Sequence, residues 1–158
     1  MPYDNRRQGP RPPRSGGERM DSGPRARLDT ASIELRATET GSLNPDLFDT
    51  VAHNAAKVIG SNDRGNKPAQ IRQFYDELVM WEEKVRHSTD ERFQEFLPFI
   101  RMLNAKAAYA QGRGHVDENF GALIARCLEQ VDSAKTLRNF KLFFEAFLGF
   151  YKLEGPKG

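Results

Sequence analysis

Hydrophobic residues along most of this chain recur at the spacing of one face of an α-helix. From residue 44 onward, no segment alternates apolar and polar residues over the length of a strand. The pattern predicts helices over about residues 44–60, 68–87, 88–111, 117–131 and 136–152. The expected fold class is all-α, a compact bundle of about five helices with short loops. The residues expected to face inward include Leu47, Ile59, Ile71, Phe74, Leu78, Phe99, Ile100, Leu103, Ala107, Phe120, Leu123, Cys127, Phe140, Phe144 and Phe147.

Capping residues and a proline set the expected helix boundaries. Asn44, Asp117 and Thr136 can each accept a hydrogen bond from an unpaired backbone N–H at a helix start. Ser88, with a glutamate three residues later, has the spacing of a capping box. Pro98 falls inside the third segment, where it either kinks one helix or begins another.

Two segments are expected to lie outside regular structure. Residues 1–43 are rich in Arg, Pro and Gly, and they bury too little apolar surface to offset the entropy of ordering. We expect a disordered tail there, which is either an arm that touches nucleic acid or a partner, or a solvated extension. The loop "SNDRGNKP" (61–68) is expected to be mobile and to leave the first helix loosely attached. Residues 44–158 would form a single helical domain.

The distribution of charge is more informative than its total of +2. Residues 1–43 carry a net charge of +2, residues 44–97 a net charge of −3, and residues 98–158 a net charge of +3. The expected body is therefore polarised along the chain. This permits a local basic surface but is unlike the global basicity of a histone-like protein.

Composition also predicts the compartment. No apolar run approaches the roughly 20 residues that span a bilayer, and the basic, proline-rich N-terminus lacks the apolar stretch of a secretory signal. The single cysteine excludes an intramolecular disulfide and is typical of a reducing compartment. We expect a cytoplasmic protein that does not bind a membrane.

The sequence lacks the patterns that carry catalysis or metal binding. His53, His87 and His115 are scattered, and no HExxH, CxxC, P-loop or nucleophile-elbow motif occurs. The acidic residues between 76 and 83 diverge around their helix, whereas a metal site needs convergent ligands. Cys127 lies within an apolar stripe, where an inert, buried thiol is expected. These observations predict a protein that is not an enzyme and that has no catalytic residue, metal site or cofactor.

Basic residues are spaced along two of the predicted helices. Arg101, Lys106 and Arg113 punctuate "RMLNAKAAYAQGRG", whose outer face otherwise carries asparagine and alanine. Arg138 and Lys141 belong to a mostly positive stripe on the outer face of the last helix. Charges at such intervals, without base-reading side chains, suit a phosphate backbone. The alternative is a set of solvated helix faces.

The end of the third helix has an unusual Gly-Arg-Gly sequence. Gly112 is expected at the left-handed position that closes the helix. Arg113 would then project from a turn, a few residues before the N-terminus of the next helix, which attracts phosphate.

Four segments of the chain have a distinctive order and spacing. They are "PAQIRQFYDELVMWEEKV", "EFLPFIRMLNAKAAYAQGRG", "FGALIARCL" and "LRNFKLFFEAFLGFYK", with QIRxFY, LPFIRMLxAKxAYAxGR and FxxFFEAFxxFYK as the most characteristic parts. In this order, over roughly residues 66–153, they resemble the small subunit of the type III-A CRISPR effector, the Csm complex.

The resemblance implies a small, all-helical, non-catalytic protein of antiviral defence. Several copies of such a subunit stack along the interior of the effector, where crRNA pairs with target RNA, while neighbouring subunits cleave and signal. The implied partners are the crRNA and target RNA backbone, other Csm complex subunits and neighbouring copies of itself. Nothing in the family pattern accounts for the arginines of residues 1–43. Carried onto this chain, the RNA-binding positions are Arg72, Arg101, Lys106, Arg113, Arg138 and Lys141, although Arg72 can instead pair with Asp76.

Two other functions remain as alternatives. A helical adaptor that binds only protein would use exposed apolar and small residues, namely Val79, Met80, Leu142, Ala146 and Gly149. A metal-dependent nuclease is disfavoured because the carboxylates do not converge.

Overall fold

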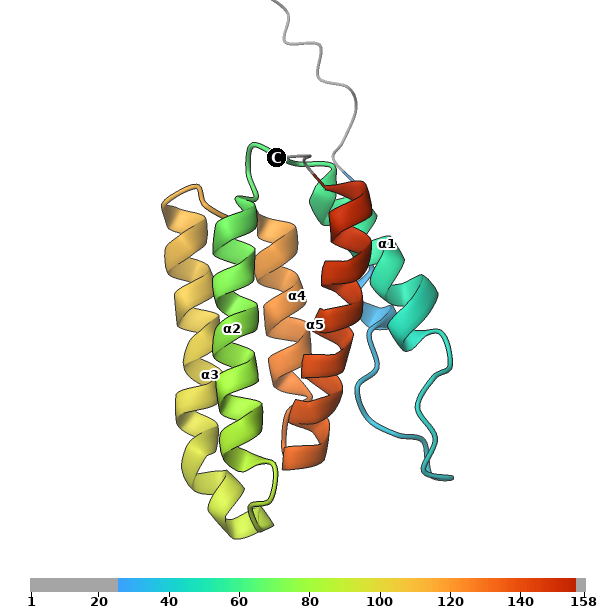
Figure 1. Ribbon diagram of the computed structural model, residues 1–158, viewed down its shortest axis with the longest axis vertical. Helices are drawn as coiled ribbons and strands as arrows, with labels where there is room; N and C mark the ends of the chain where they lie inside the picture. The colour runs from blue at the N-terminus through green and yellow to red at the C-terminus, as the bar shows by residue number, and fades with distance from the viewer. Residues whose placement is uncertain (1–25, 156–158) are drawn as a thin grey trace, which may run out of the picture.

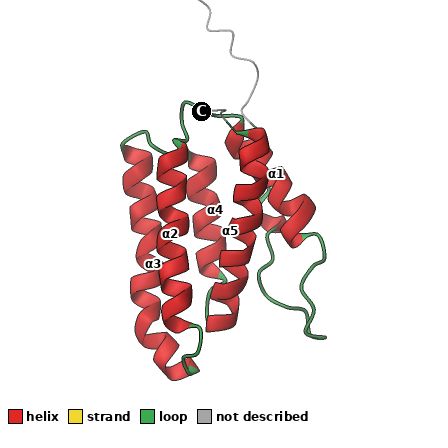
Figure 2. Cartoon of the chain, viewed as in Figure 1, coloured by secondary structure: helices red, strands yellow, loops and turns green. Residues whose placement is uncertain are grey.

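Four long helices form an up-and-down bundle. The computed structural model describes residues 26–155, in which α2 (Pro68–Val85), α3 (Asp90–Gly112), α4 (Glu118–Glu129) and α5 (Ala134–Glu154) alternate in direction (Figure 1). Short turns join them, as is usual for antiparallel neighbours. α2 packs against both α3 and α5, and α3 also packs against α4. With α1, the described residues contain five α-helices and no strand, so the predicted all-α class is confirmed (Figure 2).

The remaining α-helix, α1, is the first along the described residues and packs on the outside of the four-helix bundle. A 3-10 turn at Thr30–Ser32 precedes a π-helical turn at Leu47–Val51, which leads into α1 (Ala52–Gly60). α1 lies against α5 through small side chains (Figure 1). At the end of α1, a Cβ atom on Gly60 would stand 3.0 Å from the carbonyl oxygen of Glu154. Glycine therefore allows the two backbones to approach at this point.

The centre of the core comes from α5. Phe140, Phe143, Phe144 and Phe147 are fully buried, and the ring of Phe120 from α4 lies 6.3 Å from that of Phe144. Burying each such side chain contributes about 1.5–3 kcal/mol relative to leaving it exposed. The predicted stripe omitted Phe143. Because α1 covers one side of α5 and α2 covers another, the buried arc of α5 is wider than a single helical stripe.

Two of the predicted helix starts are wrong by a few residues. Thr89, and not Ser88, caps α3, because its Oγ1 accepts a hydrogen bond from the backbone N–H of Arg92 at 3.2 Å. Ser133, and not Thr136, caps α5. The backbone N–H of Thr136 donates to Ser133 Oγ, and the backbone N–H of Ser133 donates to Thr136 Oγ1, in a reciprocal capping box.

The other residues that were predicted to set helix boundaries are Asp117, Asn44 and Pro98, and only Asp117 caps a helix. Asp117 caps α4 as predicted, with its Oδ1 accepting from the backbone N–H of Phe120 at 2.9 Å. Asn44 instead forms a local turn, accepting from the backbone N–H of Asp46 at 3.0 Å. α3 continues through Pro98 as one helix.

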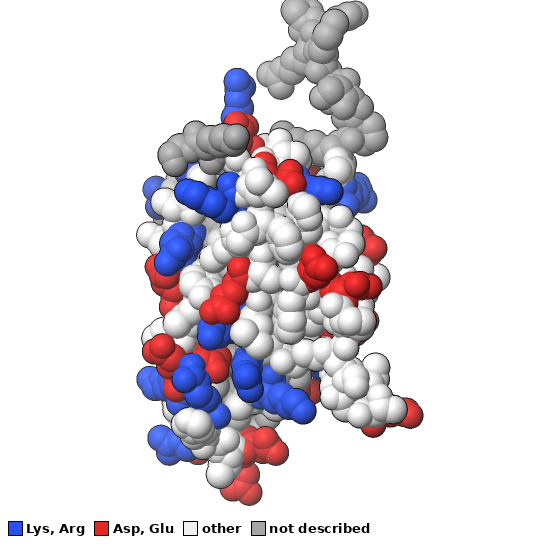
Figure 3. Space-filling view, turned by 45° about the vertical axis from the view of Figure 1, so that its right-hand side comes forward, with Lys and Arg blue, Asp and Glu red and all other residues white. Residues whose placement is uncertain are grey.

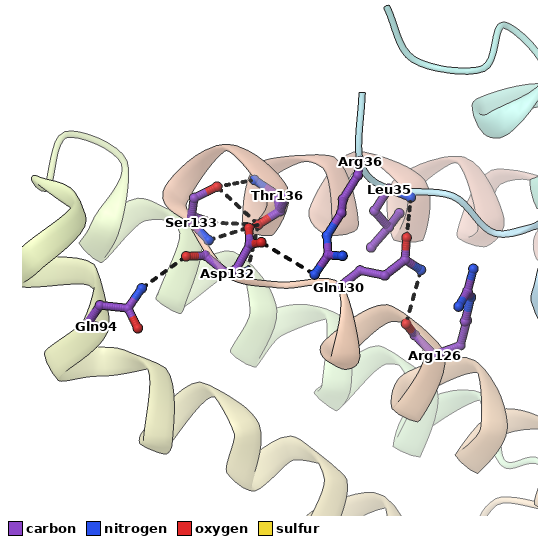
Figure 4. Close-up of polar contacts among 8 residues, drawn as sticks. All are labelled: Leu35, Arg36, Gln94, Arg126, Gln130, Asp132, Ser133 and Thr136. Carbon is purple, nitrogen blue, oxygen red and sulfur yellow. Dashed lines mark hydrogen bonds and ion pairs between the residues drawn. The ribbon is translucent and has the colours of Figure 1, made fainter. Parts of the chain in front are cut away.

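The stretch from residue 26 to about residue 36 packs on the body, so the predicted tail boundary at residue 43 is wrong for this part, whereas residues 38–42 are exposed. Ile33 and Leu35 are fully buried. Gln130 Oε1 accepts from the backbone N–H of Leu35 at 2.8 Å (Figure 4). Gln130 Nε2 also donates to the carbonyl of Ile33 at 2.8 Å. Asn139 Nδ2 donates to the carbonyl of Leu35, and Asn119 binds the backbone of Leu28. Residues 1–25, the rest of the predicted tail, lie outside the described residues.

The loop after α1 is held firmly, contrary to the predicted mobility. Asn66 is fully buried. Its Nδ2 donates to the carbonyl of Ile59 at 3.1 Å, and its Oδ1 accepts from the backbone N–H of Asp117 at 2.8 Å. The backbone N–H of Lys67 also donates to the carbonyl of His115 at 2.9 Å. The loop therefore ties α1 to the start of α4.

Gln130 provides a test of how the N-terminal segment is attached. We expect Gln130→Ala to lower the free energy of unfolding by about 1–3 kcal/mol, because the buried backbone N–H of Leu35 loses its partner and the carbonyl of Ile33 keeps only the bond from Arg126 Nε. Gln94→Ala is the matched control, since Gln94 Nε2 makes an exposed hydrogen bond to the carbonyl of Asp132 (Figure 4). Urea denaturation of both variants measures the difference, and an equal effect in the two would contradict the attachment.

Candidate nucleic-acid interface

The six predicted RNA-binding residues lie at four separate places on the surface. Arg138 and Lys141 line a hollow between the end of α2 and the start of α5. Lys106 and Arg113 line a second hollow between α2 and α3. Arg72 and Arg101 lie apart from these pairs and from each other. The structure therefore brings together two pairs and does not form one continuous site from all six.

The first hollow, which we call the basic hollow, gathers four cations from two helices. It has a volume of about 910 Å³ and is lined by Arg86 of α2 and by Lys135, Arg138 and Lys141 of α5. Two carboxylates, of Glu82 and Asp90, also line it. Figure 3 shows Lys and Arg side chains gathered over the lower part of this side of the molecule, where α2 ends and α5 begins.

A buried carboxylate orders one of these cations. The side chain of Glu82 is 3% exposed, and it accepts hydrogen bonds from Arg86 Nη2 at 2.7 Å and from Arg86 Nε at 3.1 Å. The hydrogen bonds from Arg86, helped by the positive charges of Lys141 and Arg138, lower the pKa of Glu82 although burial opposes the shift. Glu82 is therefore ionised at neutral pH and fixes the guanidinium of Arg86.

Lys141 lies deeper than its predicted place on an outer stripe. Its side chain is only 19% exposed, and its Nζ lies 3.4 Å from Glu145 Oε1. The same carboxylate accepts a hydrogen bond from the hydroxyl of Tyr75 on α2 at 2.7 Å. Burial and this carboxylate raise the pKa of Tyr75 to about 12, so the hydroxyl keeps its proton. Lys141 thus faces α2, and Arg138 is the exposed member of the pair.

The second hollow, which we call the α2–α3 hollow, has a volume of about 550 Å³. Lys106 forms an ion pair across it with Glu77 of α2. The guanidinium carbon of Arg113 lies 5.6 Å from the ring centroid of Tyr109, and Arg113 Nη1 donates to the hydroxyl of Tyr109 at 3.3 Å. Both predicted residues are therefore already engaged by a neighbour within the chain.

The turn after α3 closes on Gly114 and not on Gly112 as predicted. Gly114 has a φ of 73°, the left-handed conformation that suits glycine. Its backbone N–H donates to the carbonyl of Gln111 at 3.0 Å, and the backbone N–H of His115 donates to the carbonyl of Ala110 at 2.9 Å. This pair of hydrogen bonds is a Schellman motif, and it places Arg113 as the exposed C-cap residue.

The remaining two predicted residues lie outside both hollows. Arg72 Nε lies 3.3 Å from Asp76 Oδ1, so the intrahelical pair that the sequence allowed is formed. Arg101 is exposed on the other side of α3, in a shallow hollow that Glu129 of α4 also lines. Neither residue has a second basic side chain of the predicted set beside it.

Sequence reasoning missed several residues of these surfaces and misplaced one. Lys135 and Arg86 were not predicted, although Arg86 stands at the (i, i+4) spacing from Glu82 that marks a helical pair. Phe99 was expected to face inward, but its side chain is 55% exposed, and its ring lies 6.4 Å from that of Trp81. α3 is an edge helix with a narrow buried stripe, and Phe99 lies just outside that stripe.

The described residues contain no group of three or more His, Cys, Asp and Glu side chains that could hold a metal ion. Cys127 is fully buried, as predicted, and burial raises the pKa of its thiol. Within residues 26–155, no helix combines the length and the apolar character that a membrane crossing requires.

The pair of Glu82 and Arg86 generates a test of how the basic hollow is built. We expect Glu82→Gln to lower the free energy of unfolding at pH 7 by about 1–3 kcal/mol, because a buried, charge-assisted hydrogen-bond pair is lost. The pKa of Glu82 is lower in the folded chain than in the unfolded chain. The stabilisation of the fold by the ionised Glu82 is therefore fully present above the unfolded pKa. It is lost as the pH falls through the folded pKa.

Urea denaturation at a series of pH values measures this contribution. The difference between the wild type and Glu82→Gln should stay constant from pH 6 to pH 8 and shrink below about pH 4, near the ordinary pKa of glutamate. Glu83→Gln is the matched control, because Glu83 is exposed on the same helix. A difference that persists in acid would show that the carboxylate charge is not what stabilises this corner.

Comparison with known proteins identifies the family. A family model described as Csm2 Type III-A matches residues 42–157. No curated protein and no solved structure matches the chain. The matched region contains all five helices, together with the basic hollow and the α2–α3 hollow, and leaves the packed segment before residue 42 outside. The chain therefore belongs to the Csm2 Type III-A family and is a small subunit of the type III-A CRISPR effector, the Csm complex.

Proposed function

We propose that this chain is a non-catalytic subunit that binds the phosphate backbone of the crRNA–target RNA duplex, with several copies stacked along it in the cytoplasm. One observation carries the proposal. Four cations, namely Arg86 directly after α2 and Lys135, Arg138 and Lys141 of α5, meet in the basic hollow, where Glu82 pairs with Arg86 and Glu145 pairs with Lys141. Positive charge concentrated at one place on a chain of nearly balanced charge favours a polyanionic ligand.

The arrangement of the cations suits phosphate groups. Lys135 and Arg138 stand three residues apart in the first turns of α5 and are both exposed. The N-terminus of α5 adds the partial positive charge of the helix dipole at the same place. Because Glu82 holds Arg86 in position, less side-chain entropy is lost when RNA binds there.

The other predicted RNA-binding residues have lesser roles in this proposal. Lys106 and Arg113 provide a second point of contact at the opposite end of α2. Arg72, which is paired with Asp76, and Arg101 lie outside both hollows, and each adds only a long-range attraction.

A protein-binding role has its own support and is compatible with RNA binding. The side chains of Phe99, Met102 and Met80 are 55%, 51% and 43% exposed, and two of them belong to α3. Exposed apolar side chains of this size favour contact with another protein, either a neighbouring copy or another subunit of the complex. Of the predicted adaptor surface, Met80 and Gly149 are exposed, whereas Val79, Leu142 and Ala146 are half-buried.

Arg138 provides the direct test of backbone binding. We expect Arg138→Ala to weaken binding of a guide–target RNA duplex and to reduce the slope of log affinity against log salt by about 1, because one fewer phosphate is neutralised. Fluorescence anisotropy over a series of salt concentrations measures both quantities. The loss should be the same for duplexes of different sequence, since backbone contacts carry no sequence information.

The matched control for this test is Lys57→Ala, which removes one exposed positive charge from α1, outside the basic hollow. It should leave the affinity and the salt slope nearly unchanged. An equal loss in both variants would mean that net charge, and not the hollow, attracts RNA. A wild-type chain that does not bind RNA at low salt would overturn the proposal and favour the protein-only adaptor.

A further inference from the structure

The α2–α3 hollow has a different chemistry from the basic hollow. Its volume of about 550 Å³ lies within the range of about 300–1,000 Å³ that is typical of small-ligand sites. Side chains of three kinds line it. They are the amides of Gln70 and Gln73, the charged groups of Glu77 and Lys106, and the exposed aromatic ring of Tyr109. A surface for phosphate alone would not need the amides, the carboxylate or the ring.

Tyr109 is the most unusual of these side chains. It is 67% exposed, although it is a large, partly apolar residue on a helix that packs against two others. Its contact with Arg113 places a guanidinium over the ring and fixes the hydroxyl. An aromatic ring combined with an arginine plane is the arrangement on which unpaired nucleobases stack.

The polar groups of the hollow match the edge of a base. Gln70 Nε2 donates to Gln73 Oε1 at 3.4 Å, so the carbonyl of Gln70 and the NH₂ group of Gln73 remain for a ligand. Glu77 supplies an acceptor for the N–H groups of a base, whereas its charge would repel a phosphate. Burial, together with the charges of Lys67 and Arg113, lowers the pKa of His115, which therefore adds a neutral ring at neutral pH.

We propose that the α2–α3 hollow binds one unpaired base of RNA, which stacks on Tyr109 and is hydrogen-bonded by the side chains of Glu77, Gln70 and Gln73. Lys106 and Arg113, at the same hollow, contact the phosphates that flank this base. The inference rests on the proposed RNA-binding function and adds to it a site that recognises a base and not only the backbone.

The exposed apolar residues of α3 are separate from this hollow. Met102 and Phe99 do not line it, and Met102 precedes Tyr109 by seven residues, or about 10 Å along the helix. Met102 and Tyr109 lie on the same face of α3, two turns apart, so a protein partner that covers only Phe99 and Met102 leaves Tyr109 open, whereas a longer one would cover it. The amides of Gln70 and Gln73 and the carboxylate of Glu77 are what favour a base over a protein surface at this hollow.

Two RNA duplexes that differ by one base provide the test. One is fully paired, and the other carries a single unpaired 2-aminopurine, whose fluorescence is quenched when the base stacks. Full-length protein is titrated with each duplex while anisotropy reports affinity and 2-aminopurine emission reports stacking. We expect the wild type to quench the emission and to bind the duplex with the unpaired base about 5- to 150-fold more tightly, the range of one base–aromatic stack.

The variants separate stacking from the other contributions. Tyr109→Ala should lose both the quenching and the preference, while its affinity for the fully paired duplex stays within about twofold of the wild type. Tyr109→Phe should retain both, because the ring remains. Phe99→Ala is the matched control, since it removes an exposed aromatic side chain of α3 outside the hollow.

Each outcome bears on a different claim. Quenching and preference that survive in Tyr109→Ala would overturn the base site. So would Tyr109→Ala altering self-association in sedimentation while quenching is unchanged, because the hollow would then be a protein interface. Arg138→Ala should weaken both duplexes equally without reducing the quenching at saturation. A wild type that binds both duplexes equally without quenching overturns the base site alone, and one that binds neither overturns the backbone proposal as well.

Discussion

The burial of α5 on two sides is the constraint on which the rest of the structure depends. Four phenylalanines of this helix are fully buried, and they can be so only if α1 covers one side while α2 covers another. Gly60 allows α1 to approach the end of α5, and Ser133 with Thr136 fixes where α5 begins. Because that beginning is fixed beside the end of α2, the cations of both helices meet in the basic hollow. The core and the candidate interface therefore have a common origin.

Side-chain amides satisfy the backbone wherever the chain is irregular. Gln130 and Asn139 pair with the extended residues around Leu35, and Asn66 links the loop after α1 to the start of α4. Asn119 binds the backbone on both sides of Arg27. A buried backbone group without a partner is costly, so these amides allow non-helical segments to lie against a helical body. They also explain how residues 26–35 pack on the bundle although most of their side chains are polar or small.

Most of the fold follows from the sequence, whereas the candidate site follows only in part. The helical stripes of α2, α4 and α5 are long and regular, so the five helices could be predicted from periodicity. The packed segment around Ile33 could not, because its partners are amides about a hundred residues away. For the candidate site, the sequence predicts which residues are charged, but it does not predict which of these residues lie close together in the fold. That Arg138 is near Arg86, and Lys106 near Glu77, depends on which helices are neighbours.

The two hollows lie toward opposite ends of α2 but are not far apart. Their nearest lining residues on this helix are Glu77 and Glu82, which are five residues or about 8 Å apart along it. The exposed side of α2 carries Asp76, which is paired with Arg72, and Glu83, which repels phosphate. The hydroxyl of Tyr75 on α2 donates a hydrogen bond to Glu145 on α5 but carries no charge, because its pKa is raised to about 12, so Lys141 is the cation that offsets that carboxylate. We therefore expect the RNA phosphates to contact mainly the basic hollow. The α2–α3 hollow, toward the other end of α2, would contact an unpaired base.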